Sequence, residues 1–170
     1  MDKQSLERVL KEFVKESGED TTLILIGGLA IQFYGIKGRA TYDIDAEIVK
    51  GDLFKLYEFL KKKGIPADLT ENIGGWSVIG MPRGYRERAY TVFEDGNLKI
   101  KLLNPYDFVV AKLRRGTQED IDDAIAVFRK FKLFLGELNK YIESAVENSI
   151  KDTSIFAFKK RYDKFKQLLS

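Results

Sequence analysis

The chain has 170 residues, a length typical of one domain, and contains neither cysteine nor histidine. The missing cysteines exclude disulfides, thiolate zinc sites and a cysteine nucleophile, and the missing histidines exclude a Ser-His-Asp triad and imidazole-bound metals. The 29 basic and 26 acidic residues give a net charge of +3. Any catalysis must therefore use carboxylates, lysine, arginine, hydroxyls, backbone amides or an oxygen-bound ion.

The positive charge is concentrated in the last 20 residues. Residues 151–170 hold six basic and two acidic residues, a local charge of +4, whereas residues 1–150 carry −1. A polyanion-binding body is therefore not indicated, although the tail could touch a polyanion. No apolar stretch has the length of a membrane span and no signal peptide opens the chain. We expect a cytoplasmic protein without membrane contact.

Predicted helices and strands alternate in the first part of the chain. Apolar residues at helical spacing before Gly18 predict a first helix. The next predicted elements are a strand over 21–26, a short helix over 29–34, a strand over 42–49, and a helix over 53–63 that faces inward with Leu53, Leu56, Tyr57 and Leu60.

The later elements are expected to be mostly helical. Strands are predicted over 76–79, 89–93 and 98–103, and Asp95-Gly96 joins the last two as a hairpin. Asn104-Pro105 starts a helix to about 115, and Thr117 with Asp120 forms a capping-box pattern before helices that reach residue 170, with a break near 135–136. We expect an α/β (α+β) fold, with a mixed-sheet core over 1–116 and a helical part over 117–170 packed on it.

The stretch from residue 26 to 47 is the most informative about chemistry. A strand runs through Gly27-Gly28 into a helix N-terminus, where free amides can hold phosphate. Asp43 and Asp45 project from one face of the next strand, as oxygen ligands for Mg²⁺ do. Separately, the glycines could be an ordinary turn and the aspartates a solvated face. Together, a phosphate cradle and metal carboxylates indicate displacement at phosphorus.

These residues resemble the nucleotidyltransferase superfamily that includes DNA polymerase beta. The resemblance rests on Gly27-Gly28, on Gly38-Arg39-Ala40-Thr41 and on Asp43-Ile44-Asp45. It is strongest to small prokaryotic members, the minimal nucleotidyltransferases and abortive-infection-type toxins. The helix over 105–113, and Arg115 followed by Asp120 and Asp123, give it further support, so that it covers about residues 22–130.

The resemblance implies that the protein transfers a nucleoside monophosphate from a nucleoside triphosphate to a protein or RNA hydroxyl. Asp43 and Asp45 would be catalytic and would ligate Mg²⁺, with Mn²⁺ as an alternative. Gly27 and Gly28 would cradle the phosphates, which Arg39, Thr41 and Lys112 would help to bind. Arg39 could instead pair with a nearby acid, and Lys112 could lie on the helix surface.

A third carboxylate, which active members of the superfamily carry on a neighbouring strand, is missing from the expected strand over 76–79. Glu94 is a substitute candidate, and Glu47 is expected to be solvated. The alternative function is therefore a weak or inactive relative, an antitoxin-like regulator or a nucleotide sensor that binds nucleotide without transfer.

The basic tail carries an apolar stripe at helical spacing: Ile155, Phe158, Tyr162, Phe165 and Leu169. A helix of this kind could contact RNA or a membrane, or could pack on the core or on a second copy of the chain. Packing is the favoured interpretation, and it makes a homodimer a reasonable expectation. Trp76, which follows two glycines, could stack on a base or lie in the core.

Overall fold

The computed structural model describes residues 1–170 and divides into two compact units. The first unit comprises residues 1–72 and 89–102 and contains the sheet; the second comprises 73–88 and 103–170 and is mainly helical. The chain thus passes between the units three times, and the boundary expected near residue 116 stays a prediction. All the helices are too short or too polar to cross a lipid bilayer.

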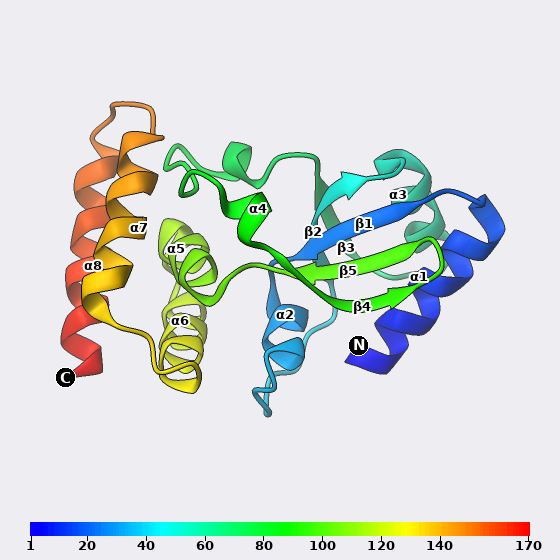
Figure 1. Ribbon diagram of the computed structural model, residues 1–170, viewed down its shortest axis with the longest axis horizontal. Helices are drawn as coiled ribbons and strands as arrows, with labels where there is room; N and C mark the ends of the chain where they lie inside the picture. Colours follow the sequence, from blue (N-terminus) through cyan, green and yellow to red (C-terminus); the bar gives the residue numbers. More distant parts are fainter. The chain divides into compact units, whose positions relative to one another are not determined.

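The first unit is a five-stranded mixed sheet with three helices (Figure 1). Its elements are α1 (Lys3–Ser17), β1 (Thr21–Leu25), α2 (Gly28–Phe33), β2 (Ile44–Lys50), α3 (Leu53–Lys62), β3 (Ala67–Thr70), β4 (Tyr90–Asp95) and β5 (Leu98–Leu102). The strand order is β3-β2-β1-β5-β4. β1 is antiparallel to β2 and parallel to β5, β2 is parallel to β3, and β4 and β5 form the expected hairpin. The predicted α/β class is confirmed.

Local sequence signals account for most of these boundaries. Gly18 ends α1 in the left-handed conformation, with a φ of 69°, which glycine adopts without steric cost. The carboxylate of Asp52 caps α3 by accepting a hydrogen bond from the Lys55 amide. α1 and α3 pack together through the rings of Phe13 and Phe59, 5.3 Å apart. Tyr57 was expected to face inward but is 40% exposed.

The predicted strand over 76–79 is wrong, and strand β3 was not predicted. Residues 76–79 form no strand; a 3₁₀ helix over Ile73–Trp76 and a turn occupy this region. The guanidinium of Arg114 binds the carbonyls of Ile73, Gly74 and Ile79, at 2.8–3.2 Å. These carbonyls are satisfied by a side chain, so they need no neighbouring strand. Trp76 is 42% exposed and is not a core residue.

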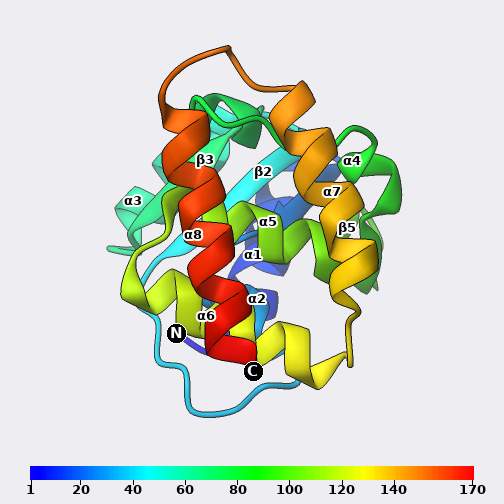
Figure 2. The ribbon, with the colours of Figure 1, turned by 90° about the vertical axis from the view of Figure 1, so that its left-hand side faces the viewer.

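The second unit packs three long helices around α5. Besides the short α4 (Tyr85–Arg88), it contains α5 (Pro105–Arg115), α6 (Gln118–Lys130), α7 (Leu135–Glu147) and α8 (Ser154–Leu169). Asn104 caps α5, and Thr117 and Asp120 form the predicted capping box of α6. α7 and α8 run alongside each other over α5 and α6 (Figure 2). The helical break lies over 131–134, slightly before the predicted position, and a second break, over 148–153, was not predicted.

The apolar stripe of the tail lies inside the second unit. Phe158, Tyr162 and Phe165 are buried, and the Tyr162 hydroxyl donates a hydrogen bond to Asn139 on α7. Arg161 donates to the carbonyls of Leu113 and Arg114, at 2.7 and 2.9 Å, and so caps the end of α5. The packing interpretation of the stripe is confirmed, so these aromatic side chains are not available to a membrane.

Candidate active site

The candidate site lies at one edge of the sheet in the first unit. Gly27 and Gly28 follow the end of β1, and Asp45 is the second residue of β2. β1 and β2 are antiparallel, so the end of one lies beside the start of the other, and the amide of Ile26 donates to the carbonyl of Asp45 at 3.0 Å. Strand order alone therefore places the glycine pair beside the aspartates.

Gly27 and Asp45 are in close contact. A Cβ atom at position 27 would lie 2.8 Å from Cγ of Asp45 and would overlap its Oδ2 atom. The backbone at Gly27 has a φ of −85°, which any residue adopts, so glycine is needed here for space. The carboxylate of Asp45 thus occupies the place of the side chain that Gly27 lacks.

Gly28 makes a similar contact with the loop before β2. A Cβ atom at position 28 would lie 3.0 Å from Cβ of Thr41 and 3.7 Å from Nη2 of Arg39. The Thr41 hydroxyl donates to Oδ1 of Asp43 at 3.1 Å, and Gln32 of α2 donates to the carbonyl of Arg39 at 3.4 Å. The two glycines, Arg39, Thr41 and both aspartates therefore form one cluster.

The two carboxylates of the cluster differ in exposure. Asp43 is exposed just before β2, and Asp45 is half-buried. Thr41, whose hydroxyl donates a hydrogen bond to Asp43, is buried. Two neighbouring negative charges repel each other, and a cation that binds both relieves the repulsion. The exposure of Asp43 leaves one side of the pair accessible to a ligand from solvent.

The donor set fits a Mg²⁺ ion that shares its ligands with a substrate. Mg²⁺ binds one or two protein carboxylates and takes its other ligands from phosphates and water. Nowhere in residues 1–170 do three acidic side chains form a group that would hold a metal ion by themselves. Asp43 and Asp45 thus fit a site in which substrate phosphates and water supply the remaining metal ligands. They do not fit a site in which the protein supplies all the ligands.

Two expectations about further carboxylates are wrong. Glu47 was expected to be solvated but is fully buried, on a strand that lies between β1 and β3. Glu94 was a candidate third carboxylate, but it lies beside the β4–β5 turn, opposite Lys99. That turn is at the other end of the sheet from Asp45, so Glu94 cannot join the cluster.

The sequence reasoning missed Asp68. It lies on the edge strand β3, directly beside Asp45 in the parallel register, and its side chain is exposed. Residues paired in this way point to the same face of a sheet, so Asp68 is the acid nearest to Asp45 on a neighbouring strand. The available signal was weak: a four-residue strand after Gly64-Ile65-Pro66, without a run of β-branched residues.

Lys112 belongs to the second unit and is not on the surface. It is buried, and its ammonium pairs with Asp123 at 2.9 Å and with Asp120 at 3.5 Å. Arg115 and Thr117 also donate to Asp120. Burial alone would raise the pKa of Asp120, but the hydrogen bonds from Arg115 and Thr117 and the charge of Lys112 outweigh it and lower the pKa to about 2. A phosphate-binding role for Lys112 stays a prediction.

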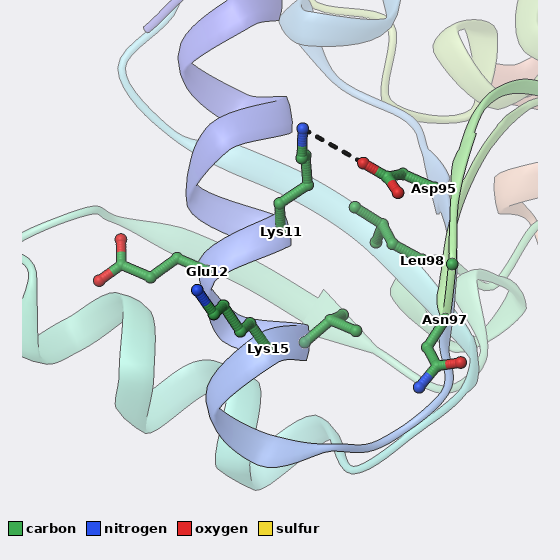
Figure 3. A pocket seen from close by; sticks show the side chains of 8 residues that line it. Lys11, Glu12, Lys15, Asp95, Asn97 and Leu98 are labelled. Carbon is green, nitrogen blue, oxygen red and sulfur yellow. Dashed lines mark ion pairs between the residues drawn. The ribbon is translucent and has the colours of Figure 1, made fainter.

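A pocket at the other end of the sheet has no comparable chemistry. It has a volume of about 490 Å³ and lies between α1 and the β4–β5 turn (Figure 3). Its ion pair, between Lys11 and Asp95 at 3.2 Å, is half-exposed and is therefore weak. The candidate site is therefore defined by the glycine–aspartate contacts and not by this pocket.

Comparison with known proteins identifies a family for the chain. No curated protein and no solved structure showed significant similarity to the chain. A family model described as "Nucleotidyltransferase of unknown function (DUF6036)" matches residues 4–169, nearly the whole chain. The chain therefore belongs to this family of nucleotidyltransferases of unknown function.

Proposed function

We propose that this nucleotidyltransferase transfers a nucleoside monophosphate from a nucleoside triphosphate to a hydroxyl group of a protein or an RNA. The single observation that carries the proposal is the cluster in which Gly27 and Gly28 touch Asp45 and Thr41. The cluster brings a glycine turn and a carboxylate pair together at one edge of the sheet, where Asp43 is exposed. This combination suits binding of a metal-bound triphosphate.

The reaction would be a displacement at the α-phosphorus. The hydroxyl oxygen of the acceptor forms a bond to the α-phosphorus, the bond to the bridging oxygen of the β-phosphate breaks, and pyrophosphate leaves. Asp43 and Asp45 would hold Mg²⁺, which when bound supplies positive charge to the phosphate oxygens. Thr41 orients Asp43 through its hydrogen bond, and Arg39 would pair with a phosphate oxygen beside Gly28.

The proton of the acceptor hydroxyl needs a base. We assign this role to Asp68, because it is the exposed acid beside Asp45 on a neighbouring strand. With an acid at this place, the lack of acids over 76–79 no longer argues against transfer. The binding-only alternative makes a different prediction, namely that nucleotide binds normally and no transfer occurs.

The first test is calorimetric binding of each nucleoside triphosphate, with and without Mg²⁺. Binding that requires Mg²⁺ and is lost in Asp45→Asn supports the proposal. Asp95→Asn is the matched control, because it removes one half-exposed carboxylate at the other end of the sheet. Absence of binding by the wild type, or equal loss in both variants, would contradict the proposal.

Transfer is then measured with triphosphates labelled at the α-phosphate. The label is followed separately into the protein and the RNA of a cell extract. Labelled product that disappears with Asp43→Asn supports transfer and identifies the class of acceptor. Normal Mg²⁺-dependent binding without labelled product in either fraction would favour the binding-only alternative.

A further inference from the structure

The connection between α6 and α7 exposes positive charge and a large aromatic side chain together. Arg129, Lys130 and Lys132 are exposed, and the side chain of Phe134 is 74% exposed. No acidic residue occurs between positions 124 and 136. None of the three basic residues takes part in an ion pair. The segment is therefore both cationic and apolar at its surface.

The segment is ordered by its own hydrogen bonds. The amides of Phe131 and Leu133 donate to carbonyls of α6, and the amide of Phe134 donates to the hydroxyl of Tyr106 at 3.1 Å. Phe134 is thus presented to solvent from a fixed backbone. Ordering the segment in advance reduces the entropy that a ligand would lose on binding.

Two residues between α6 and α7 do not favour the backbone conformation that they adopt. Phe134 is the N-cap of α7 but makes no side-chain cap, where serine, threonine or aspartate would stabilise the helix. Lys132 has a φ of 50°, in the left-handed region that favours glycine. An exposed phenylalanine and a strained lysine weaken the fold slightly, so a contact outside the chain is a better explanation for them.

The neighbouring helix α8 adds a further positive charge. The ring of Phe128 on α6 meets that of Phe165 on α8 edge to face, with centroids 5.7 Å apart. This contact holds the end of α6 against the second half of α8, as Figure 2 also shows. Lys164 precedes Phe165 and is exposed. We call the set Arg129, Lys130, Lys132, Phe134 and Lys164 the basic–aromatic patch.

The charge of the patch decides which ligand fits it. Two copies of the chain that met through this patch would bring four positive charges against four, which opposes self-association. A phosphate backbone matches the charge, and the exposed ring of Phe134 can stack on a base that is not already paired and stacked. We propose that the basic–aromatic patch binds single-stranded nucleic acid. This proposal does not depend on the proposed transfer reaction.

The test is fluorescence anisotropy with a labelled oligouridylate about 12 nucleotides long, a length in the usual range of site sizes. Four phosphate contacts predict a slope of log affinity against log salt of about −3. The triple variant Arg129→Gln, Lys130→Gln, Lys132→Gln should bind more than about tenfold more weakly and lose about two units of this slope. Phe134→Ala should weaken binding about tenfold and leave the slope unchanged.

The matched control replaces three exposed lysines of the first unit, Lys15, Lys61 and Lys62, with glutamine. It removes the same charge and should leave affinity within about twofold, since binding is local to the patch. Urea unfolding of the patch variants shows that their fold is intact.

Three outcomes would overturn the proposal. The first is absence of binding by the wild type at low salt. The second is an equal loss in the control and patch variants, which would indicate attraction to the overall charge. The third is a change in oligomeric state of the Phe134→Ala variant, measured by light scattering, which would make the patch a protein interface.

Discussion

Asp45 lies against the α-carbon of Gly27, so closely that no side chain fits between them. The contact joins the second residue after β1 to the second residue of β2, at the end of the antiparallel pair where β1 stops and β2 starts. It fixes the carboxylate at the edge of the sheet. In the proposed reaction, Gly27 would act as a positioning residue for Asp45.

Gly27→Ala should therefore reduce metal-dependent nucleotide binding. The added Cβ atom would overlap the Asp45 carboxylate, which is half-buried and can turn away toward solvent. We expect affinity for Mg²⁺ and triphosphate to fall more than about tenfold, and stability to fall by about 1–3 kcal/mol from overpacking. Calorimetry and urea unfolding measure the two effects.

Gly136→Ala serves as the control, because a Cβ atom there meets nothing within 4 Å. Position 136 lies in helix α7, where alanine is favoured over glycine by about 0.5–1 kcal/mol. This variant should be slightly more stable than the wild type and should bind nucleotide normally. Normal nucleotide binding by Gly27→Ala would show that the position of Asp45 does not matter.

Thr41→Val should weaken the site without disturbing the packing. Valine has the shape of threonine but cannot donate the 3.1 Å hydrogen bond to Oδ1 of Asp43. We expect Mg²⁺-dependent binding to fall by several-fold, which corresponds to about 1 kcal/mol for one hydrogen bond. Thr41→Ser keeps the hydroxyl and should restore most of the affinity. Equal affinities for the valine and serine variants would contradict an orienting role for the hydroxyl.

The main features of the first unit could be predicted because they follow from local signals. Gly18 ends α1, Asp52 starts α3, and Asp95-Gly96 forms the turn between β4 and β5. Each of these signals affects only residues close to it in the sequence. The glycine–aspartate cluster could also be predicted, since one short helix separates its parts.

The failures depended on contacts between distant residues. The segment over 76–79 has strand-like residues, but Arg114, about 35 positions later, takes up neighbouring carbonyls. Glu47 is fully buried, and its burial depends on what covers its face of the sheet, which the sequence of one strand does not reveal. Asp68 lies on an edge strand that β2 stabilises by pairing. Its own sequence is too short and too weakly β-forming to indicate a strand.

Asp68→Asn should slow transfer more than it weakens binding. If Asp68 accepts the proton of the acceptor hydroxyl, its amide variant cannot act as the base, and the rate should fall by about 10²–10⁴. Triphosphate binding should change by less than about threefold, because Asp43 and Asp45 remain. Glu94→Gln, at the other end of the sheet, should change neither quantity. Full transfer activity in Asp68→Asn would remove Asp68 from the reaction.

The buried ion pairs of the second unit predict a dependence of stability on pH. The pKa of Asp120 falls from its ordinary 3.8 to about 2 on folding. A lowered carboxyl pKa adds stability above the unfolded-state pKa, and this stability disappears as the pH falls from about 4 to about 2. The shift corresponds to about 2 kcal/mol at neutral pH. Asp120→Asn removes this contribution and leaves Lys112 with Asp123 as its remaining partner.

Urea unfolding of the wild type, Asp120→Asn and Asp122→Asn, at about pH 7 and about pH 3, tests this dependence. At neutral pH we expect Asp120→Asn to be less stable than the wild type by about 3 kcal/mol, as for other broken buried pairs. At about pH 3 the difference should shrink by about 1 kcal/mol, because Asp120 gains a proton more readily in the unfolded chain than in the folded one. Asp122 is exposed on the same helix, so its variant should stay within about 0.5 kcal/mol of the wild type. A difference between wild type and Asp120→Asn that is the same at both pH values would mean that the pKa of Asp120 does not change on folding, and it would contradict this prediction.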